Sequence, residues 1–363
     1  MANFIRKILI ILNIITALFL IFAYLSAYIS PADFSFFAFF GLIYPFLLII
    51  NILFIVYWLL KRNKFFLLST LTVLLGWSFL SSFFQLSFNK KAFEKNEQQV
   101  KVLSYNVRIF NLWNWSSEKT RTTKTYNYIK NSKSNIVCLQ EFYSNNTAGK
   151  NAKDTLLNSS ILKYAHISFA KSKNKIYHHG IATFTSYPII KKGIVQLEDY
   201  ENFCIYTDLK IDKDTIRVYN LHLESIHLGH NDYQTIDNIN NDTAVDVIKY
   251  TSILKKLRTG YIKRSRQVDI ISAHVDKSPY PVIVCGDFND PPFSYSYNRI
   301  TRKLKDAFKE SGNGISSTYI HKYSTFRIDY ILHSPSLKSF NFKRLKVELS
   351  DHYPIESVFQ TID

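Results

Sequence analysis

The sequence predicts an α+β domain preceded by three transmembrane helices, and three observations support this fold class. The first 88 residues contain three long apolar runs. The remainder alternates short strand-like segments with scattered helical ones, without the regular strand-helix-strand rhythm of a parallel sheet. The three cysteines, Cys138, Cys204 and Cys285, lie singly in apolar runs and predict buried thiols rather than a disulfide framework. The predicted parts are a membrane segment at 1–88, a linker at 89–100 and a folded domain at 101–363.

The apolar runs are long enough to cross a bilayer. Ile8–Ile29, Phe34–Leu60 and Phe65–Phe88 hold 22, 27 and 24 residues without a charge, and a span needs roughly 20. A water-soluble helical bundle would need polar faces that these runs lack, and three runs are too many for a cleaved signal peptide. Residues 8–88 are therefore expected to lie in a lipid bilayer.

The positions of the cations predict an orientation. Arg6 and Lys7 precede the first run, and Lys61, Arg62 and Lys64 lie between the second and third. Because basic residues stay on the cytoplasmic side, three spans place the following domain outside the cytoplasm. Lysines at 90, 91 and 95 argue mildly for the opposite orientation. The expected location is the cell (inner) membrane, crossed several times.

The folded domain is basic. The first 88 residues net +4, so about +13 of the chain's +17 belongs to the rest. Such a surface favours nucleic acid, phosphate esters or acidic lipid as partners. A generally lysine-rich composition is an equally good explanation, because the lysines are scattered.

Hydrophobic periodicity predicts the elements of this domain in order. Strands are expected at Val102–Phe110, Ile136–Glu141, Tyr164–Ala170, Gly180–Tyr187, Ile189–Leu197, Phe203–Ile211, Thr215–Glu224, Phe326–His333, Ser339–Leu349 and Tyr353–Gln360, and in the apolar run that Gly286 closes within Val282–Asp290. Helices are expected at Lys119–Ser132, near Asp154–Leu162, in the second half of Asp232–Lys277 and near Tyr295–Phe308. Gly260 and the basic residues at 263–266 interrupt or decorate the third of these helices.

The stretch Val282–Asp290 is central to the functional prediction. An apolar run ends at Gly286, and Asp287 and Asn289 follow two positions apart. Residues i and i+2 of a strand point to one face, so these two side chains are expected side by side at the strand exit. An Asx turn is the simpler alternative on this stretch alone.

Other polar residues occupy strand ends where an apolar residue would pack better. Asn106 and Asp329 interrupt strand patterns, Glu141 ends one, and Ser350, Asp351 and His352 lie between two. Asn220, His222 and Glu224 alternate along a further strand. Each alone has a structural explanation, such as a turn, an ion pair of Arg327 with Asp329, or a satisfied core histidine, but together they indicate one site.

This inventory suits metal-assisted phosphoester hydrolysis. Glu141 and Asn106, with Asp351, offer the oxygen ligands that Mg²⁺ prefers. Asp287 is the candidate for activating water, with Asn289 beside it. His222 and His352 supply donors for phosphate charge, and Asp329 is expected to support His352. Zinc is disfavoured because no Cys/His cluster has ligand spacing.

Seven stretches in this order resemble the endonuclease/exonuclease/phosphatase superfamily. They are Leu-Ser-Tyr-Asn-Val at 103–107, Cys-Leu-Gln-Glu at 138–141, Gly-Ile-Ala-Thr-Phe-Thr-Ser-Tyr-Pro-Ile at 180–189, Asn-Leu-His-Leu at 220–223, Gly-Asp-Phe-Asn at 286–289, Arg-Ile-Asp-Tyr-Ile at 327–331 and Ser-Asp-His-Tyr-Pro at 350–354. The resemblance covers about 100–363. It implies a four-layer α/β sandwich with two central mixed β-sheets.

The resemblance also implies roles for the candidate residues. Catalytic roles fall on His222, Asp287, Asn289, Asp329 and His352, and metal binding falls on Asn106, Glu141 and Asp351. The implied ion is Mg²⁺, with Mn²⁺ as a substitute. His178, His179 and the region 226–278 match no one subfamily and receive no role.

The predicted function is a membrane-anchored, metal-dependent phosphoesterase of endonuclease/exonuclease type. A phospholipid or inositol-phosphate phosphoesterase is the alternative substrate class, and a non-catalytic binding module on the same fold is the third reading. The expected partners are a phosphoester substrate, either nucleic acid or a phospholipid headgroup, and the bilayer. No obligate protein partner is inferred.

Overall fold

The structure is a computed structural model, and it describes residues 2–85, 99–111, 120–145, 151–158, 161–170, 177–197, 203–229, 232, 234–235, 247–320 and 326–361. The predicted linker lies mostly outside these residues. The chain forms two compact units. Unit 1 comprises Met1–Leu80, Glu224–Val268 and Phe293–Arg299, and unit 2 comprises Ser81–Leu223, Asp269–Pro292 and Ile300–Asp363. The apolar segment and two later parts of the chain therefore belong to the same unit.

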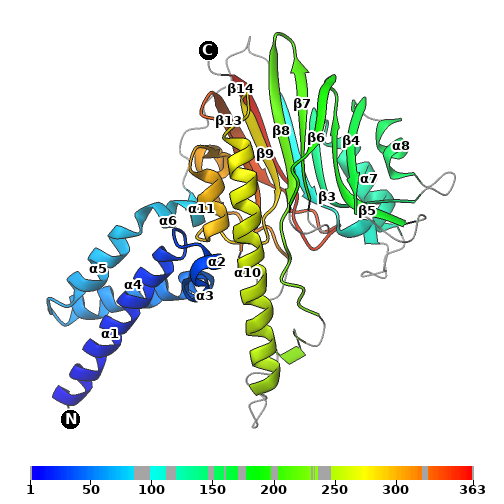
Figure 1. Cartoon of the computed structure of the whole chain (residues 1–363). Helices are drawn as coiled ribbons and strands as arrows, with labels where there is room; N and C mark the ends of the chain where they lie inside the picture. Colours follow the sequence, from blue (N-terminus) through cyan, green and yellow to red (C-terminus); the bar gives the residue numbers. More distant parts are fainter. Residues whose placement is uncertain are drawn as a thin grey trace. The chain divides into compact units, whose positions relative to one another are not determined.

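Unit 1 contains the apolar helices (Figure 1). These are α1 Ala2–Leu25, α2 Pro31–Phe34, α3 Phe36–Leu42, α4 Tyr44–Leu60, α5 Phe66–Leu75 and the start of α6 Trp77–Phe83. Among the described residues, α1 is the single helix both long and apolar enough to be a span. The pairs α3–α4 and α5–α6 bend by 67° and 65°, so the segment has one candidate span, or up to three if each bent pair is one.

The two bends have local causes. Pro45 lies in the first turn of α4, where its ring excludes the carbonyl of residue i−4 and prevents α3 from continuing. Gly76 is the C-cap of α5, where the Tyr24 ring occupies the place that a side chain at 76 would need. The sequence predicts three transmembrane helices, and the structure divides the second and third of these apolar runs at the two bends.

The polarity of these helices is inverted compared with a water-soluble bundle. Asn13, Asn51 and Ser69 are fully buried. The Ser69 hydroxyl lies 2.6 Å from Asn13 Oδ1 and 2.9 Å from Asn51 Oδ1, and so joins α1, α4 and α5. Large aliphatic side chains such as Leu60 and Leu75 are instead exposed, at 79% and 75%.

Unit 1 also includes parts of α10 Val247–Val275 and α11 Tyr295–Thr301. The Ser26 hydroxyl donates to the Phe293 carbonyl at 3.0 Å, and Asn298 Nδ2 donates to the Ala27 carbonyl at 2.8 Å. The rings of Tyr44 and Phe293 lie 4.6 Å apart. The apolar helices therefore pack against residues that follow the predicted catalytic stretch in the sequence.

Helix α10 is one unbroken helix of 29 residues, and Gly260 does not interrupt it. The buried Arg264 lies beside this glycine and donates to the Glu224 carbonyl at 2.9 Å. A side chain at 260 would press on the Arg264 guanidinium, which explains a glycine within the helix.

Unit 2 is built on two six-stranded mixed sheets. The first has the order β13-β14-β2-β3-β5-β4, with β13 Leu337–Arg344, β14 Ile355–Thr361, β2 Val100–Asn106, β3 Ile136–Asn145, β5 Tyr177–Thr185 and β4 Tyr164–Phe169. The second has the order β10-β12-β9-β8-β7-β6, with β10 Lys305–Asp306, β12 Asp329–His333, β9 Val282–Asp287, β8 Asp214–His222, β7 Phe203–Ile211 and β6 Ile189–Ile194. Each sheet has one parallel pair, β2–β3 and β8–β9.

The apolar core lies between the two sheets. Val102 and Cys138 of the first sheet belong to one buried cluster with Ile283, Cys285 and Ile331 of the second. The alternate residues of β2 and β3 pack outward against α7 Arg121–Asn131 and α8 Ala152–Leu157. On the second sheet the Tyr219 hydroxyl contacts His274 Nδ1, in the last turns of α10, at 2.8 Å.

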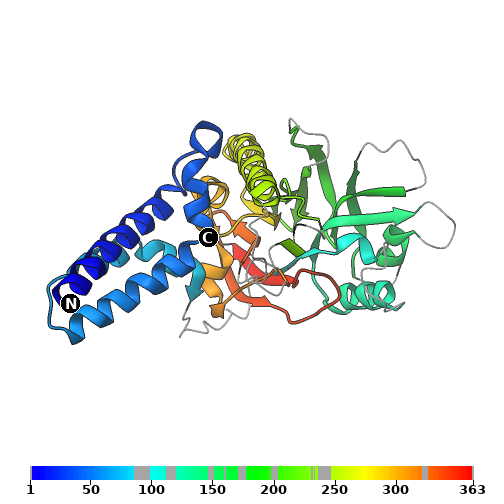
Figure 2. The same ribbon diagram turned by 90° about the horizontal axis from the view of Figure 1, so that it is seen from below.

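The α+β class and the four-layer sandwich are therefore confirmed, and Figure 2 shows the sheets edge on with helices outside them. A short strand pair joins β1 Phe84–Gln85 to β11 Gly314–Ile315, and the short helix α12 Ala307–Ser311 follows β10. A short left-handed turn at Arg108–Asn111 follows β2.

Candidate active site

The predicted site residues gather at one edge of the two sheets. In the second sheet, His222 at the end of β8 pairs in register with Asp287 at the end of β9, and Asp329 at the start of the antiparallel β12 also pairs with Asp287. In the first sheet, Asn106 at the end of β2 is in register with Gln140 of β3. Carboxyl ends of parallel strands meet at one edge, which explains why residues distant in sequence converge.

Asn106 joins the two sheets at this edge. Its Nδ2 donates to Glu141 Oε1 at 3.1 Å and to Asp287 Oδ2 at 3.0 Å. Its Oδ1 accepts from the Arg108 backbone N–H at 3.0 Å. The strand stops here instead of continuing to Phe110, as the sequence suggested, because residues 108–111 have positive φ angles.

Glu141 is turned toward the site by a bulge. The pairing of β3 with β5 shifts between Leu139 and Phe142, and Glu141 has a φ of +49°. An extra residue in one strand re-aims its side chain and is frequent next to active sites. The Glu141 carboxylate is 35% exposed, so it remains open to solvent and ligands.

Two histidines flank the Asp287 carboxylate. His222 Nε2 and His352 Nε2 each lie 3.7 Å from Asp287 Oδ2, and His222 Nε2 lies 3.9 Å from Glu141 Oε1. These separations exceed hydrogen-bond length. The two ring nitrogens thus converge on one point without using their hydrogen-bonding capacity on Asp287.

Asp329 holds His352 from the other side. His352 Nδ1 lies 2.9 Å from Asp329 Oδ2, and both residues are buried. Burial alone would lower the pKa of His352, but the carboxylates of Asp329, Asp287 and Asp351 outweigh it and raise that pKa well above 6.5. His352 is therefore a proton-bearing group with a fixed orientation.

Burial raises the pKa of Asp287, whereas burial alone lowers the pKa of His352. Loss of solvation raises the pKa of this carboxyl from its usual value, the histidines at 352 and 222 oppose the shift, and Asp329 adds to it. Asp287 Oδ1 accepts from the Asn289 backbone N–H at 2.8 Å. A carboxylate with a raised pKa is a better proton acceptor near neutral pH.

Two predicted residues lie differently from the expectation. Asn289 has a φ of +52°, and its backbone N–H donates to Asp287 Oδ1 at 2.8 Å, which is the hydrogen bond of an Asx turn. Its side-chain Nδ2 donates to the Leu223 carbonyl at 2.9 Å. Asp351 pairs with Arg108 at 3.2 Å, and no hydrogen bond or ion pair joins it to Asn106 or Glu141 among the described residues. Arg108 itself bonds to Asn106 through its backbone, so Asp351 is tied to the site indirectly.

The sequence did not reveal the polar link beneath the site. Gln140 Nε2 donates to Asn220 Oδ1 at 2.7 Å, and Asn220 Nδ2 donates to the carbonyls of Ala182 at 3.0 Å and Leu139 at 3.3 Å. Both side chains are fully buried. The signal that could have revealed this link is that the amides Gln140 and Asn220 each interrupt an apolar strand. His178 and His179 lie in β5 opposite Ser144 and Tyr143, and no role follows from that.

The donor set fits a hard divalent cation. One ligand-type atom each from Asp287, Asp329 and His352 lies within 4.8 Å of the others. A protonated His352 has no free nitrogen lone pair for a metal ion, however, and its Nδ1–H donates to Asp329 Oδ2. The open Glu141 carboxylate offers the more accessible oxygen ligand for such an ion, and the neighbouring Asn106 presents its Nδ2 to Glu141 while its Oδ1 accepts from the Arg108 N–H.

The fold and this site together define the class of phosphoester-hydrolysing enzymes. A model of the endonuclease/exonuclease/phosphatase family matches residues 103–352, and the chain belongs to that family. A second model, described as a domain of unknown function (DUF8431), matches residues 6–83. None of the curated proteins compared with the chain matches it.

Solved structures share the fold at low identity. An endonuclease/exonuclease/phosphatase from Beutenbergia cavernae superimposes with a TM-score of 0.54 at 12% identity, covering 73% of this chain and 72% of its own. The human Nocturnin catalytic domain with bound sulfate anion gives 0.53 at 16%, covering 72% and 94%. ANGEL2, a 2′,3′-cyclic phosphatase, gives 0.51 at 16%, covering 76% and 100%.

Proposed function

We propose that the chain is a membrane-anchored phosphodiesterase that needs a divalent cation, with 1–88 as the membrane segment, 89–100 as the linker and 101–363 as the catalytic domain. The observation that carries the proposal is the convergence on Asp287. Asn106 lies 3.0 Å from its Oδ2, and the Nε2 atoms of His222 and His352 lie 3.7 Å from the same oxygen.

These residues have the chemistry of water attack on phosphorus. Asp287 takes the proton of the attacking water, which its raised pKa favours. His352, kept protonated by Asp329, and His222 donate to phosphate oxygens as charge develops on them. Asn289 keeps the Asp287 carboxylate in place through its backbone N–H and lies beside it to position substrate or water.

Glu141 and Asn106 would hold Mg²⁺, or Mn²⁺ in its place, with Asp351 as a further carboxylate near the ion. When bound, the cation supplies positive charge that stabilises the developing charge on phosphate. Glu141 suits this role because its carboxylate is partly exposed, whereas Asp287 and Asp329 are buried.

The inverted polarity of the apolar helices supports membrane anchoring. Leucines at 60 and 75 face outward, while Asn13, Asn51 and Ser69 are enclosed. In hydrocarbon, polar side chains are stable only when they pair with one another between helices. With each bent pair counted as one span, the cations before α1 and after α4 favour a catalytic domain outside the cytoplasm.

Nucleic acid is the proposed substrate class, because the domain carries a net charge of about +13 and phosphate contacts dominate nucleic-acid affinity. A phospholipid headgroup is the second candidate, because the anchor would hold the site near lipid. The full chain in neutral detergent is incubated with Mg²⁺ and single-stranded DNA, RNA, sphingomyelin or a phosphoinositide. Cleavage of DNA or RNA that declines steeply with salt supports a nuclease, and hydrolysis of lipid alone would replace that substrate assignment.

A further inference from the structure

A pocket of about 350 Å³ lies away from the catalytic residues, between α12 and the end of β13. Its apolar wall is formed by Phe308, Ile315 and Phe342, and Lys343, Arg344 and Lys346 supply its basic groups. No carboxylate lines it. The volume is within the range of small-ligand sites, which is roughly 300–1,000 Å³.

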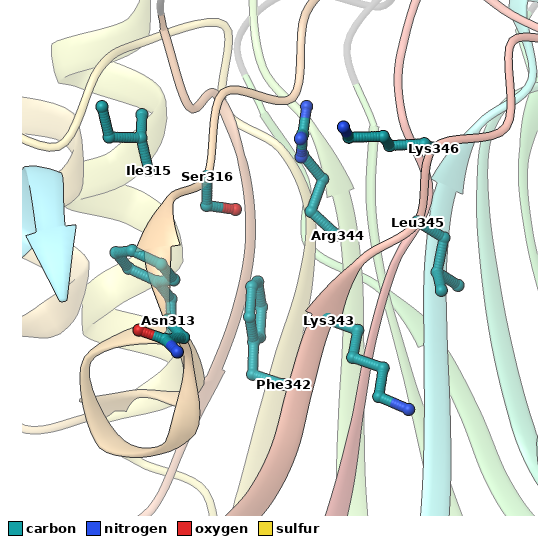
Figure 3. A pocket seen from close by; sticks show the side chains of 9 residues that line it. Asn313, Ile315, Ser316, Phe342, Lys343, Arg344, Leu345 and Lys346 are labelled. Carbon is teal, nitrogen blue, oxygen red and sulfur yellow. The ribbon is translucent and has the colours of Figure 1, made fainter. Parts of the chain in front are cut away.

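Two of the cations point toward the same place. The Lys346 ammonium extends toward the Arg344 guanidinium, whereas Lys343 points in the other direction (Figure 3). Neither Arg344 nor Lys346 forms an ion pair with a carboxylate in the part of the chain that the structure describes. Like charges that face each other are unfavourable unless an anion lies between them.

Arg344 is held in place before any ligand arrives. Its Nη1 donates to the Ser317 carbonyl at 3.2 Å, and its guanidinium lies 4.7 Å from the ring centre of Tyr353. These contacts leave further guanidinium N–H groups for a ligand, because arginine has five. Lys346 is exposed and adds a second, adaptable cation.

The pocket wall also contacts the chain where it leaves the apolar segment. Ile315 of β11 pairs with Phe84 of β1, the residue that directly follows α6. Two residues before Phe84, the Ser82 carbonyl accepts a hydrogen bond from Arg327 Nη2 at 3.0 Å. The same Arg327 nitrogen pairs with Asp306 at 2.8 Å. Both Phe84 and Ile315 are exposed, at 39% and 51%, and offer an apolar surface beside the basic groups.

We propose that this pocket binds the phosphate of an acidic phospholipid headgroup from the bilayer in which the chain is anchored. Arg344 and Lys346 contact the phosphate, and the apolar wall at Ile315 and Phe84 meets the first carbons of the lipid. The inference rests on the membrane anchoring proposed above, but not on catalysis. Basic side chains near a membrane surface attract anionic headgroups, and an adjacent apolar surface adds contact with the lipid carbons.

The pocket is also connected to the segment that carries His352. Tyr353, which stacks on Arg344, follows His352 directly, and Tyr319 lies 5.2 Å ring to ring from His352. Ser317, which accepts from Arg344, is two residues before Tyr319. Headgroup binding therefore holds the loop that carries His352 close to the lipid surface.

The test measures headgroup binding to the full chain in neutral detergent, with EDTA present so that hydrolysis cannot contribute. Native mass spectrometry gives dissociation constants for dioctanoyl phosphatidylglycerol, dioctanoyl phosphatidylcholine, glycerol 3-phosphate and inorganic phosphate. The variant is Lys346→Glu, which places a carboxylate beside Arg344. The control is Lys213→Glu, the same charge change at an exposed turn between β7 and β8.

The expected result is saturable binding of phosphatidylglycerol and none of phosphatidylcholine. At about 1 kcal/mol per charge near a membrane surface, Lys346→Glu weakens binding about thirtyfold, and Lys213→Glu leaves it unchanged. Equal affinity of wild type and Lys346→Glu for phosphatidylglycerol would overturn the site. Free phosphate binding as tightly as the lipid would overturn the lipid as its source.

Anchoring itself is checked separately by carbonate extraction of membranes. A chain released by carbonate refutes the anchor, whereas a retained chain without headgroup affinity refutes this inference alone. Absence of phosphodiesterase activity affects neither measurement, so failure of the catalytic proposal is distinguishable.

Discussion

Replacing Asp329 by asparagine tests how the carboxylate acts on His352. The Asp329 side chain lies 2.9 Å from His352 Nδ1 in a buried setting, and the amide of Asp329→Asn has the same shape without the charge. At a charge separation of about 4 Å and an effective dielectric constant of about 20, the lost attraction is about 4 kcal/mol. Since each 1.36 kcal/mol is a tenfold rate effect, the ceiling is about a thousandfold.

We therefore expect kcat/KM to fall about 100- to 1,000-fold for bis(4-nitrophenyl) phosphate with Mg²⁺, using the full chain in detergent. The pH profile supplies the readout that a merely structural effect would not move. His352 acts while protonated, so activity is lost as pH rises through its pKa, and removing the carboxylate that raises this pKa moves the alkaline limb to lower pH.

Asp208→Asn is the matched control. Asp208 is a buried carboxylate of the same sheet, held by Arg217 at 2.6 and 2.8 Å, away from the catalytic residues. It should lose about 3 kcal/mol of stability but keep the kcat/KM of the folded fraction and the wild-type pH profile. Unchanged kcat/KM in Asp329→Asn, or an equal loss in Asp208→Asn, would refute the reasoning.

Three further predictions concern stability of the full chain. Gln140→Leu should lower the free energy of unfolding by about 2 kcal/mol in denaturant titrations, because the buried Asn220 loses its donor at 2.7 Å. Ser69→Ala should lower the thermal midpoint in micelles through a loss of about 1 kcal/mol between helices, and Thr70→Ala, which loses only a bond within its own helix, should not match it. Burial lowers the pKa of His166 to about 4, so the unfolded chain binds a proton first and stability falls as pH drops from 6.5 to 4, by about 2 kcal/mol at pH 5. His166→Gln should flatten that dependence, and an unchanged slope would contradict it.

The strand-end residues were predictable because their chemistry conflicts with their position. Asp287, His222 and Asp329 each occupy a strand where an apolar residue would pack better, and register alone brings them to one edge. The end of β2 at Asn106 was not predictable, because residues 108–111 have a left-handed backbone that apolar periodicity does not encode.

Contacts between distant segments account for the remaining differences. The metal-binding role of Asp351 stays a prediction, and the structure adds a pairing with Arg108 that depends on how the chain turns after β2. Helix α10 continues through Gly260, beside which the buried Arg264 reaches the carbonyl of the distant Glu224. Local sequence patterns contain neither fact.

The most direct test of the catalytic assignment is the Mg²⁺-dependent hydrolysis rate of the Asp287→Asn full chain. The amide loses one bond, from Asn106 Nδ2 or from the Asn289 N–H, but it also removes a buried charge that burial disfavours. The chain should therefore stay folded while hydrolysis falls at least about a thousandfold, as loss of a proton acceptor implies. A folded Asp287→Asn chain that hydrolyses phosphodiesters within tenfold of the wild-type rate would contradict the account.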